Sequence, residues 1–223
     1  MTLAGVLLAV CACAPSLPRN EYGLEVVADK DLYLRTVAED PSKELVALQE
    51  VVPGISLDIR YATSDNFMRE QLYPVAKALL RRPAAESLVE VQHDLEERGL
   101  GLKVFDAYRP YEVTERMWEP VQNPGYVAEP AKGSRHNRGC AVDLTLVDRN
   151  GEELLMPTGF DDFTERAGRY YKDLPEEAIR NRDLLREVME ARGFVALETE
   201  WWHYDYQGWE RFELLDLPLI ELP

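Results

Sequence analysis

Hydrophobic residues recur along the chain with a helical period in three places. The pattern predicts one helix from Pro83 that ends at Gly99, a second after Pro110, and a third over residues 176–192 with Gly193 as its cap. The apolar positions of these helices are Ala84, Leu88, Val91 and Leu95, then Val113 and Met117, then Leu184, Leu185, Val188 and Met189. Each set forms one stripe, so each helix is expected to face the core on one side.

Alternating and β-branched residues predict strands between these helices. Residues 45–62 predict one or two short strands broken at Pro53 and Gly54, and residues 100–106 and 139–147 predict one strand each. Residues 194–206 form an aromatic segment of strand character. The Asp-Arg-Asn-Gly sequence at 148–151 predicts a hairpin turn and therefore antiparallel pairing. Because helices and strands do not alternate regularly, we expect an α+β fold with a small antiparallel-rich sheet and flanking helices.

The length and the charge limit the possible functions. The 223 residues are enough for one domain with a proper core, which we expect over residues 22–223. Lys and Arg number 25 against 41 Asp and Glu, and the formal net charge is −16. A surface this acidic repels phosphate backbones, which argues against nucleic acid as a partner.

The first thirteen residues carry no charged side chain and are almost all small or apolar. They are too few to span a bilayer but suit a secretory signal, and Ala12-Cys13 resembles the lipobox of bacterial lipoproteins. This interpretation predicts a signal over 1–13, a short tether over 14–21, a lipid anchor through Cys13 and a site of action on the periplasmic side of the cell envelope. The alternative is a buried N-terminal segment, and without a working signal the protein would be cytoplasmic.

Cys140 is the one thiol outside the predicted signal, so the domain cannot contain an internal disulfide. It could be a nucleophile, but a small buried hydrophobe beside a strand is the favoured interpretation. The chain has three histidines. His93 lies off the apolar stripe of its helix and is expected at the surface without a role.

The two other histidines lie in segments that contain further functional residue types. His136 belongs to a glycine-containing loop, and Asp143 follows on a strand whose other face is apolar. His203 comes much later, three residues after Glu200. Two His and one carboxylate suit Zn²⁺ and leave a fourth position open, as in catalytic sites. We therefore predict one zinc ion held by His136, Asp143 and His203, with Glu200 as the catalytic base.

Arg109 stands before Pro110 at the end of a predicted strand. A guanidinium there could stabilise the oxyanion that forms when water attacks a peptide carbonyl. The alternative is an arginine in a turn that forms a salt bridge with Asp106. The sequence contains no His-Glu-x-x-His motif, which excludes the zincin arrangement.

Four segments together resemble the zinc D-alanyl-D-alanine dipeptidases of the VanX type, which are related to the zinc D,D-carboxypeptidases and share the hedgehog/DD-peptidase fold. The resemblance covers roughly residues 45–210. Its motifs are Arg60-Tyr61-Ala62-Thr63 with Asn66-Phe67, Asp-x-Tyr-Arg-Pro at 106–110, Ser-x-His-x-x-Gly-x-Ala-x-Asp at 134–143, and Glu-Trp-Trp-His-Tyr at 200–204. One departure is Arg69, which stands where the family often has glycine.

The resemblance implies a role for each matching position. It supports the three zinc ligands, Glu200 as general base and Arg109 as the residue that stabilises the transition-state oxygen. Ser134, Tyr61 and Asp106 would contact a small dipeptide substrate, and Asp162 would bind its ammonium group, with Asp161 as the alternative match. The implied reaction is hydrolysis of D-Ala-D-Ala.

Two other functions stay open at this stage. A D,D-carboxypeptidase that trims peptidoglycan stem peptides would suit an envelope protein. A zinc-bound recognition module without catalysis, as in the hedgehog domain, would belong to another class, although the presence of Glu200 and Arg109 speaks against it.

Overall fold

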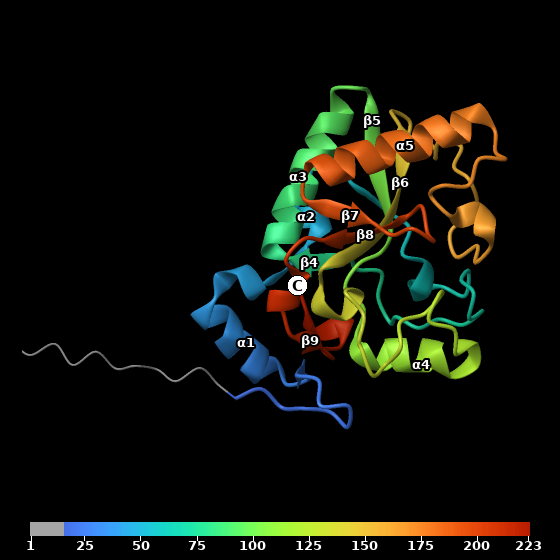
Figure 1. Ribbon diagram of the computed structural model, residues 1–223. Helices are drawn as coiled ribbons and strands as arrows, with labels where there is room; N and C mark the ends of the chain where they lie inside the picture. The colour runs from blue at the N-terminus through green and yellow to red at the C-terminus, as the bar shows by residue number, and fades with distance from the viewer. Residues whose placement is uncertain (1–15) are drawn as a thin grey trace, which may run out of the picture.

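A five-stranded sheet forms the centre of the computed structural model, which describes residues 16–223 (Figure 1). Its strands follow the order β3-β5-β6-β8-β7. They span β3 (Ser56–Leu57), β5 (Leu100–Asp106), β6 (Ala141–Asp148), β7 (Phe194–Ala196) and β8 (His203–Tyr206). The pair β3 and β5 is parallel and the other three pairs are antiparallel. The sheet brings segments from residues 56 to 206 side by side.

Two long helices cover one face of this sheet. Helix α3 (Arg82–Glu96) contacts β5 and also α5 (Glu176–Ala191), which in turn contacts β6 and β7. Pro83 lies in the first turn of α3, where its missing N–H costs nothing, and Gly99 ends the segment with a φ of +73°. Helix α4 (Tyr111–Val121) lies at the opposite end of the molecule from α5 (Figure 1).

The alternation of side chains along β6 determines which face of the sheet can carry polar functional residues. Val142, Leu144 and Leu146 belong to the hydrophobic core. Asp143 alternates with them and therefore points to the other face, away from the two long helices. The strand begins two residues later than expected, because Gly139 takes a left-handed φ of +65°. One face of the sheet is thus free to carry a polar site.

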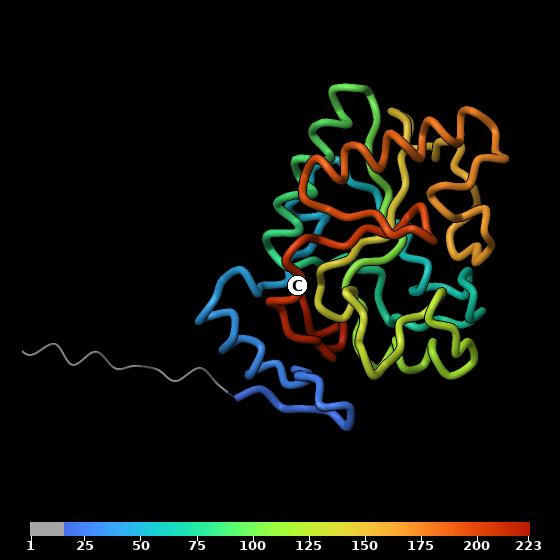
Figure 2. The backbone as a smooth tube through the Cα atoms, viewed as in Figure 1, coloured from blue at the N-terminus to red at the C-terminus, as the bar shows by residue number. Residues whose placement is uncertain are grey.

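The N-terminal part of the described chain packs against its C-terminal residues. Strand β1 (Val26–Val27) pairs in parallel with β9 (Leu214–Leu215), and α1 (Lys30–Glu39) begins at Asp29, whose carboxylate caps the helix by accepting from Leu32 N–H. Figure 2 shows this blue segment beside the red C-terminal residues. A second small sheet pairs β2 (Leu45–Ala47) with β4 (Leu79–Arg81), and the short helix α2 (Leu48–Val51) follows β2.

The expected α+β fold is confirmed, with differences in detail. Residues 45–62 form two short strands with α2 between them. The segment 194–206 is two antiparallel strands rather than one, so residues 197–202 form a connection. The chain reverses at 148–151 as predicted, but the returning residues form only an isolated bridge between Val147 and Glu153.

The predicted signal and Cys13 lie outside residues 16–223, as does the beginning of the tether. Among the residues that the structure describes, no helix is both long and apolar enough to cross a membrane.

Candidate metal centre

Strand register brings Asp143 and His203 together. They are directly opposed residues of the antiparallel pair β6 and β8, so their side chains leave the sheet on the same face. On the other side of β6, a register shift between Val104 and Asp106 places Asp106 opposite Asp143. Such a bulge re-aims the residues at the end of a strand. Three acidic or imidazole side chains therefore lie in a row across three strands.

His136 reaches this row from the short 3₁₀ helix η3 (His136–Arg138). Its Nδ1 lies 2.6 Å from the carbonyl oxygen of Ala107. A carbonyl can only accept, so Nδ1 carries the proton and Nε2 is left with a lone pair. Gly139 ends the turn, and a Cβ there would come within 2.5 Å of the Leu45 side chain. The glycine is thus required both by its φ and by space.

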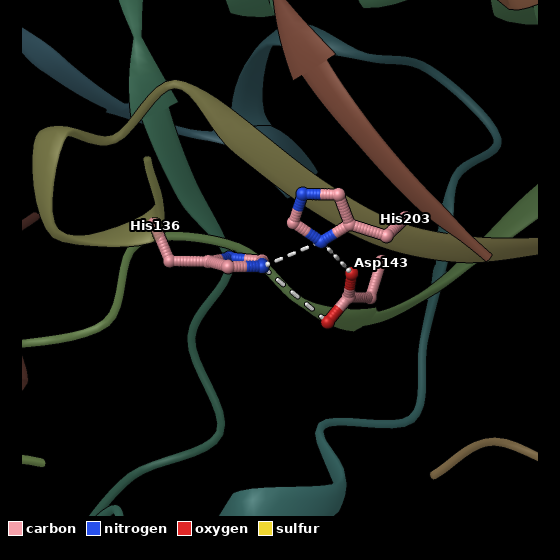
Figure 3. Close-up of side chains that lie close together, drawn as sticks. All are labelled: His136, Asp143 and His203. Carbon is pink, nitrogen blue, oxygen red and sulfur yellow. Dashed lines mark hydrogen bonds and ion pairs between the residues drawn. The ribbon is translucent and has the colours of Figure 1, made fainter. Parts of the chain in front are cut away.

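The three side chains converge as a ligand set (Figure 3). His136 Nε2 lies 3.2 Å from His203 Nδ1 and 3.5 Å from an oxygen of Asp143, and His203 Nδ1 lies 2.9 Å from the other oxygen. Ligand atoms of a tetrahedral zinc ion are about 3.3 Å apart, given bonds of about 2 Å. All three residues are buried. The donor types, their spacing and their burial fit a Zn²⁺ ion without rearrangement.

Glu200 lies in the connection before β8 and lines the same cavity as the three ligands. Burial raises the pKa of its carboxyl to about 8, an effect that the nearby His203 partly offsets. The position of Glu200 beside the three ligands suits a general base.

Arg109 also lines the cavity, directly after β5. Its Nε and one terminal nitrogen donate to a single oxygen of Asp106, at 3.0 and 2.7 Å. The other Asp106 oxygen accepts from the Tyr73 hydroxyl and the Ala107 N–H. The expected salt bridge with Asp106 is present, and it fixes the guanidinium at the edge of the cavity. The role of Arg109 toward an oxyanion stays a prediction.

Asp106 itself differs from its expected position as a substrate contact. Its side chain is fully buried behind Arg109 and does not line the cavity. All of its described contacts are protein groups, which it holds in place. Its second oxygen holds Arg109 and also lies 3.7 Å from Nδ1 of the ligand His136.

Tyr61, from the 3₁₀ helix η2 (Arg60–Ala62), and Asp161, from a loop, form a further part of the cavity wall, which we call the far side. Ser134 also lines the cavity, and its hydroxyl accepts from His136 N–H at 3.2 Å. The Tyr61 hydroxyl donates to the carboxylate of Asp161, at 3.1 and 3.2 Å. Burial raises the pKa of Asp161 to about 7; Asp143 adds to this, and the hydrogen bond from Tyr61 opposes it. Asp161 has a φ of +60°, a conformation that non-glycine residues rarely adopt and that collects at functional sites.

The structure places Asp161 and Asp162 differently, and only Asp161 lines the cavity. The Asp162 carboxylate accepts from Thr164 N–H at 3.1 Å, and the residue does not line the cavity. The left-handed backbone at Asp161 turns that side chain inward instead. The alternative match is therefore the one that faces the cavity.

The cavity has a volume of about 430 Å³, which suits a small ligand. Its remaining wall includes aromatic rings from three separate loops. Phe163 stacks against Tyr126 with ring centroids 4.8 Å apart and meets Phe67 at 5.2 Å. Nearby, Arg69 takes a φ of +57°, which explains why glycine suits that position. Sequence patterns did not indicate Tyr126 or Phe163, because loop contacts leave no periodic signal.

Two further cavity residues, Arg135 and Asp205, were also missed. Asp205 lies two positions after His203 on β8, so both side chains are on one face. His203 Nε2 and an oxygen of Asp205 are 2.9 Å apart. The i, i+2 spacing on a strand was the available signal. Cys140 is buried, as expected, and burial raises its thiol pKa to about 12.

An α+β fold that carries a buried His-Asp-His set beside a free carboxylate and a fixed guanidinium defines a peptidase of the metal-dependent class. The sequence model of the peptidase M15 family, described as D-Ala-D-Ala dipeptidase, matches residues 41–214. The chain belongs to this family. The resemblance expected from the four motifs is thereby confirmed, and so is the expectation of an enzyme.

Curated relatives agree with this assignment. A D-alanyl-D-alanine dipeptidase of Escherichia coli K12 is 37% identical over 172 residues, which cover 77% of this chain and 89% of the relative. Dipeptidases of the same name from Enterococcus faecium and Streptomyces coelicolor are 33% and 31% identical, each over 70% of this chain and 88% of the relative. The matches extend over nearly the whole length of these relatives.

Proposed function

We propose that this protein is a zinc-dependent dipeptidase that hydrolyses D-Ala-D-Ala. The observation that carries the proposal is the convergence of His136, Asp143 and His203 in one small cavity with Glu200 and Arg109. Zinc suits the donor set, because imidazole and carboxylate are among its usual ligands and three protein donors leave one of its four tetrahedral positions open. When bound there, the ion would act as a Lewis acid that polarises the scissile carbonyl and acidifies water.

Glu200 and Arg109 divide the remaining chemistry. Glu200 takes a proton from the attacking water and then returns it to the amine of the leaving D-alanine. Arg109 stays charged and in place through its bond to Asp106, and its guanidinium stabilises the negative charge that develops on the carbonyl oxygen.

Asp161 supports a substrate with a free amino group. It is a mostly buried carboxylate at the far side of the cavity, and among residues 16–223 its side-chain hydrogen-bond partner is the hydroxyl of Tyr61. An ammonium group would provide the opposite charge that such a carboxylate lacks. An N-acylated peptide has no such charge and would also have to fit a longer chain into about 430 Å³.

Two assays test the proposal against its alternatives. Metal analysis of the purified chain should find one zinc per molecule. Free D-Ala-D-Ala should be hydrolysed much faster than an N-acylated peptide that ends in D-Ala-D-Ala. The reverse preference would establish a D,D-carboxypeptidase, and a zinc-loaded protein that is inert on both peptides would establish a recognition module.

We also propose that the protein acts at the periplasmic side of the cell envelope, anchored by lipid on Cys13. The support is the apolar residues 1–13 and the small residue before that cysteine. Labelled fatty acid should be incorporated into the full-length protein and lost in Cys13→Ala. Equal labelling of the variant, or a cytoplasmic location of the parental chain, would contradict the anchor.

A further inference from the structure

His203 has partners at both of its ring nitrogens. Its Nδ1 faces the ligand set, 2.9 Å from Asp143 and 3.2 Å from His136 Nε2 (Figure 3). Its Nε2 lies 2.9 Å from an oxygen of Asp205. Both residues stand on β8 two positions apart, so a single strand supplies a ligand and the group that contacts its other nitrogen.

The contact between Asp205 and Nε2 of His203 affects which ring nitrogen carries the proton. A neutral imidazole has one N–H and one lone pair, and a carboxylate attracts the N–H. A carboxylate oxygen lies 2.9 Å from each ring nitrogen, Asp143 at Nδ1 and Asp205 at Nε2. With Asp143 and Nδ1 both turned to a metal ion, the proton would lie on Nε2 toward Asp205. His136 is the mirror case, because its Nδ1–H donates to the backbone carbonyl of Ala107 and its Nε2 is left free. Only the acceptor of His203 is a side chain, so only this one can be removed by substitution.

Arg135 and Trp209 hold Asp205 in place. The second oxygen of Asp205 lies 3.5 Å from Arg135 Nε. The Arg135 guanidinium lies over the ring of Trp209, with Cζ 4.7 Å from the ring centroid. Trp209 belongs to the 3₁₀ helix η5 (Trp209–Arg211), whereas Arg135 directly precedes His136. The contacts thus connect the strand of one ligand to the loop of the other.

The two links differ in strength. The Asp205 side chain is 15% exposed and sits directly on the ligand, whereas that of Arg135 is 45% exposed and meets Asp205 at a long distance. A half-exposed salt bridge of this length contributes little to stability. The contact between Asp205 and His203 must therefore contribute more to positioning the ligand than the salt bridge between Arg135 and Asp205.

We propose that Asp205 is a positioning residue of the metal centre, which fixes the His203 tautomer that offers Nδ1 to the ion, and that Arg135 on Trp209 orients the Asp205 carboxylate. This inference rests on the zinc site of the proposed function. It goes beyond that site because it assigns a task to three residues that need not touch zinc or substrate.

The first test is zinc affinity, measured by competition with a chromophoric chelator. Asp205→Asn keeps the shape of the side chain but removes the charge, and we expect affinity to fall about 10- to 100-fold. Arg135→Gln should cause a loss of at most about fivefold. Glu210→Gln, an exposed carboxylate beside Trp209, is the matched control and should have parental affinity. The melting temperature of each zinc-free variant reports on folding separately.

The second test needs no variant and so does not depend on folding. Nitrogen-15 NMR of the zinc-loaded parental protein should show His203 with its proton on Nε2 and His136 with its proton on Nδ1. Ligation of His203 through Nε2 would overturn the inference, as would an Asp205→Asn affinity within twofold of the parental value. A parental chain that binds no zinc would instead overturn the proposed function, and this inference with it.

Discussion

The two sides of the cavity are built in different ways. The ligand side is mounted on regular structure: Asp143 and His203 are opposed across β6 and β8, and η3 holds His136 by a bond to Ala107. The far side has no strand: Tyr61 comes from the short 3₁₀ helix η2 and Asp161 from a loop 100 residues further along the sequence. Strand register leaves little freedom, whereas loops depend on individual backbone angles. We therefore expect changes on the ligand side to alter turnover and changes on the far side to alter substrate binding.

The largest effect is expected for Glu200→Gln. The amide cannot accept the proton of water, so kcat should fall about 10²- to 10⁴-fold. Zinc content should stay at the parental value, because Glu200 is not one of the three converging ligands. Steady-state kinetics together with metal analysis of the same sample measure both quantities. A kcat near the parental value would show that Glu200 is not the general base.

Arg109→Lys should have the next largest effect. Lysine keeps the charge but cannot donate from two nitrogens to Asp106, so the cation loses its fixed position. We expect kcat to fall about 10²- to 10³-fold with little change in KM. Arg60→Lys is a suitable control, since Arg60 forms a salt bridge with Asp58 and does not line the cavity. A loss confined to KM would assign Arg109 to substrate binding instead.

The same contrast between regular structure and loops explains what the sequence could predict. Alternation along 139–147 placed Asp143 opposite the apolar face, and helical periodicity located α3 and α5 nearly to the residue. The residues between β7 and β8 were harder, because a short connection rich in aromatic residues has the composition of a strand. Helix α1 was not predicted because its amphipathic pattern is weak, and it is held by contacts with β1 and the 3₁₀ helix η1 (Pro41–Lys43).

Sequence patterns alone could not distinguish Asp161 from Asp162. Neighbouring carboxylates in a loop have no periodicity, and the outcome depends on a φ of +60° at one of them. The family motifs were more useful for assigning site residues, because they indicate which residues share a site even where no local pattern shows how the chain brings them together. Asp205 was missed for a different reason, because the Glu-Trp-Trp-His-Tyr motif that was recognised ends at Tyr204.

Asp161→Asn should distinguish the two sides of the cavity directly. Replacing the carboxylate removes a charged partner of the substrate ammonium, so KM for D-Ala-D-Ala should rise about 10- to 100-fold. The kcat at saturation should change much less. Asp162→Asn is the matched control and should be close to parental, because its carboxylate contacts Thr164 outside the cavity. The opposite ranking of the two variants would restore Asp162 as the ammonium site.

The smallest expected effect is a pH dependence of KM. Burial raises the pKa of Asp161 to about 7, and a carboxyl below its pKa is neutral and cannot pair with an ammonium group. KM should therefore rise as pH falls, about fourfold between about pH 8 and pH 6.5. The hydrogen bond from Tyr61 lowers this pKa, so Tyr61→Phe should move the transition to higher pH. In Asp161→Asn the transition should disappear. If KM still depended on pH in that variant, another group would be responsible for the titration. The far side of the cavity would then be less important for substrate binding than its geometry indicates.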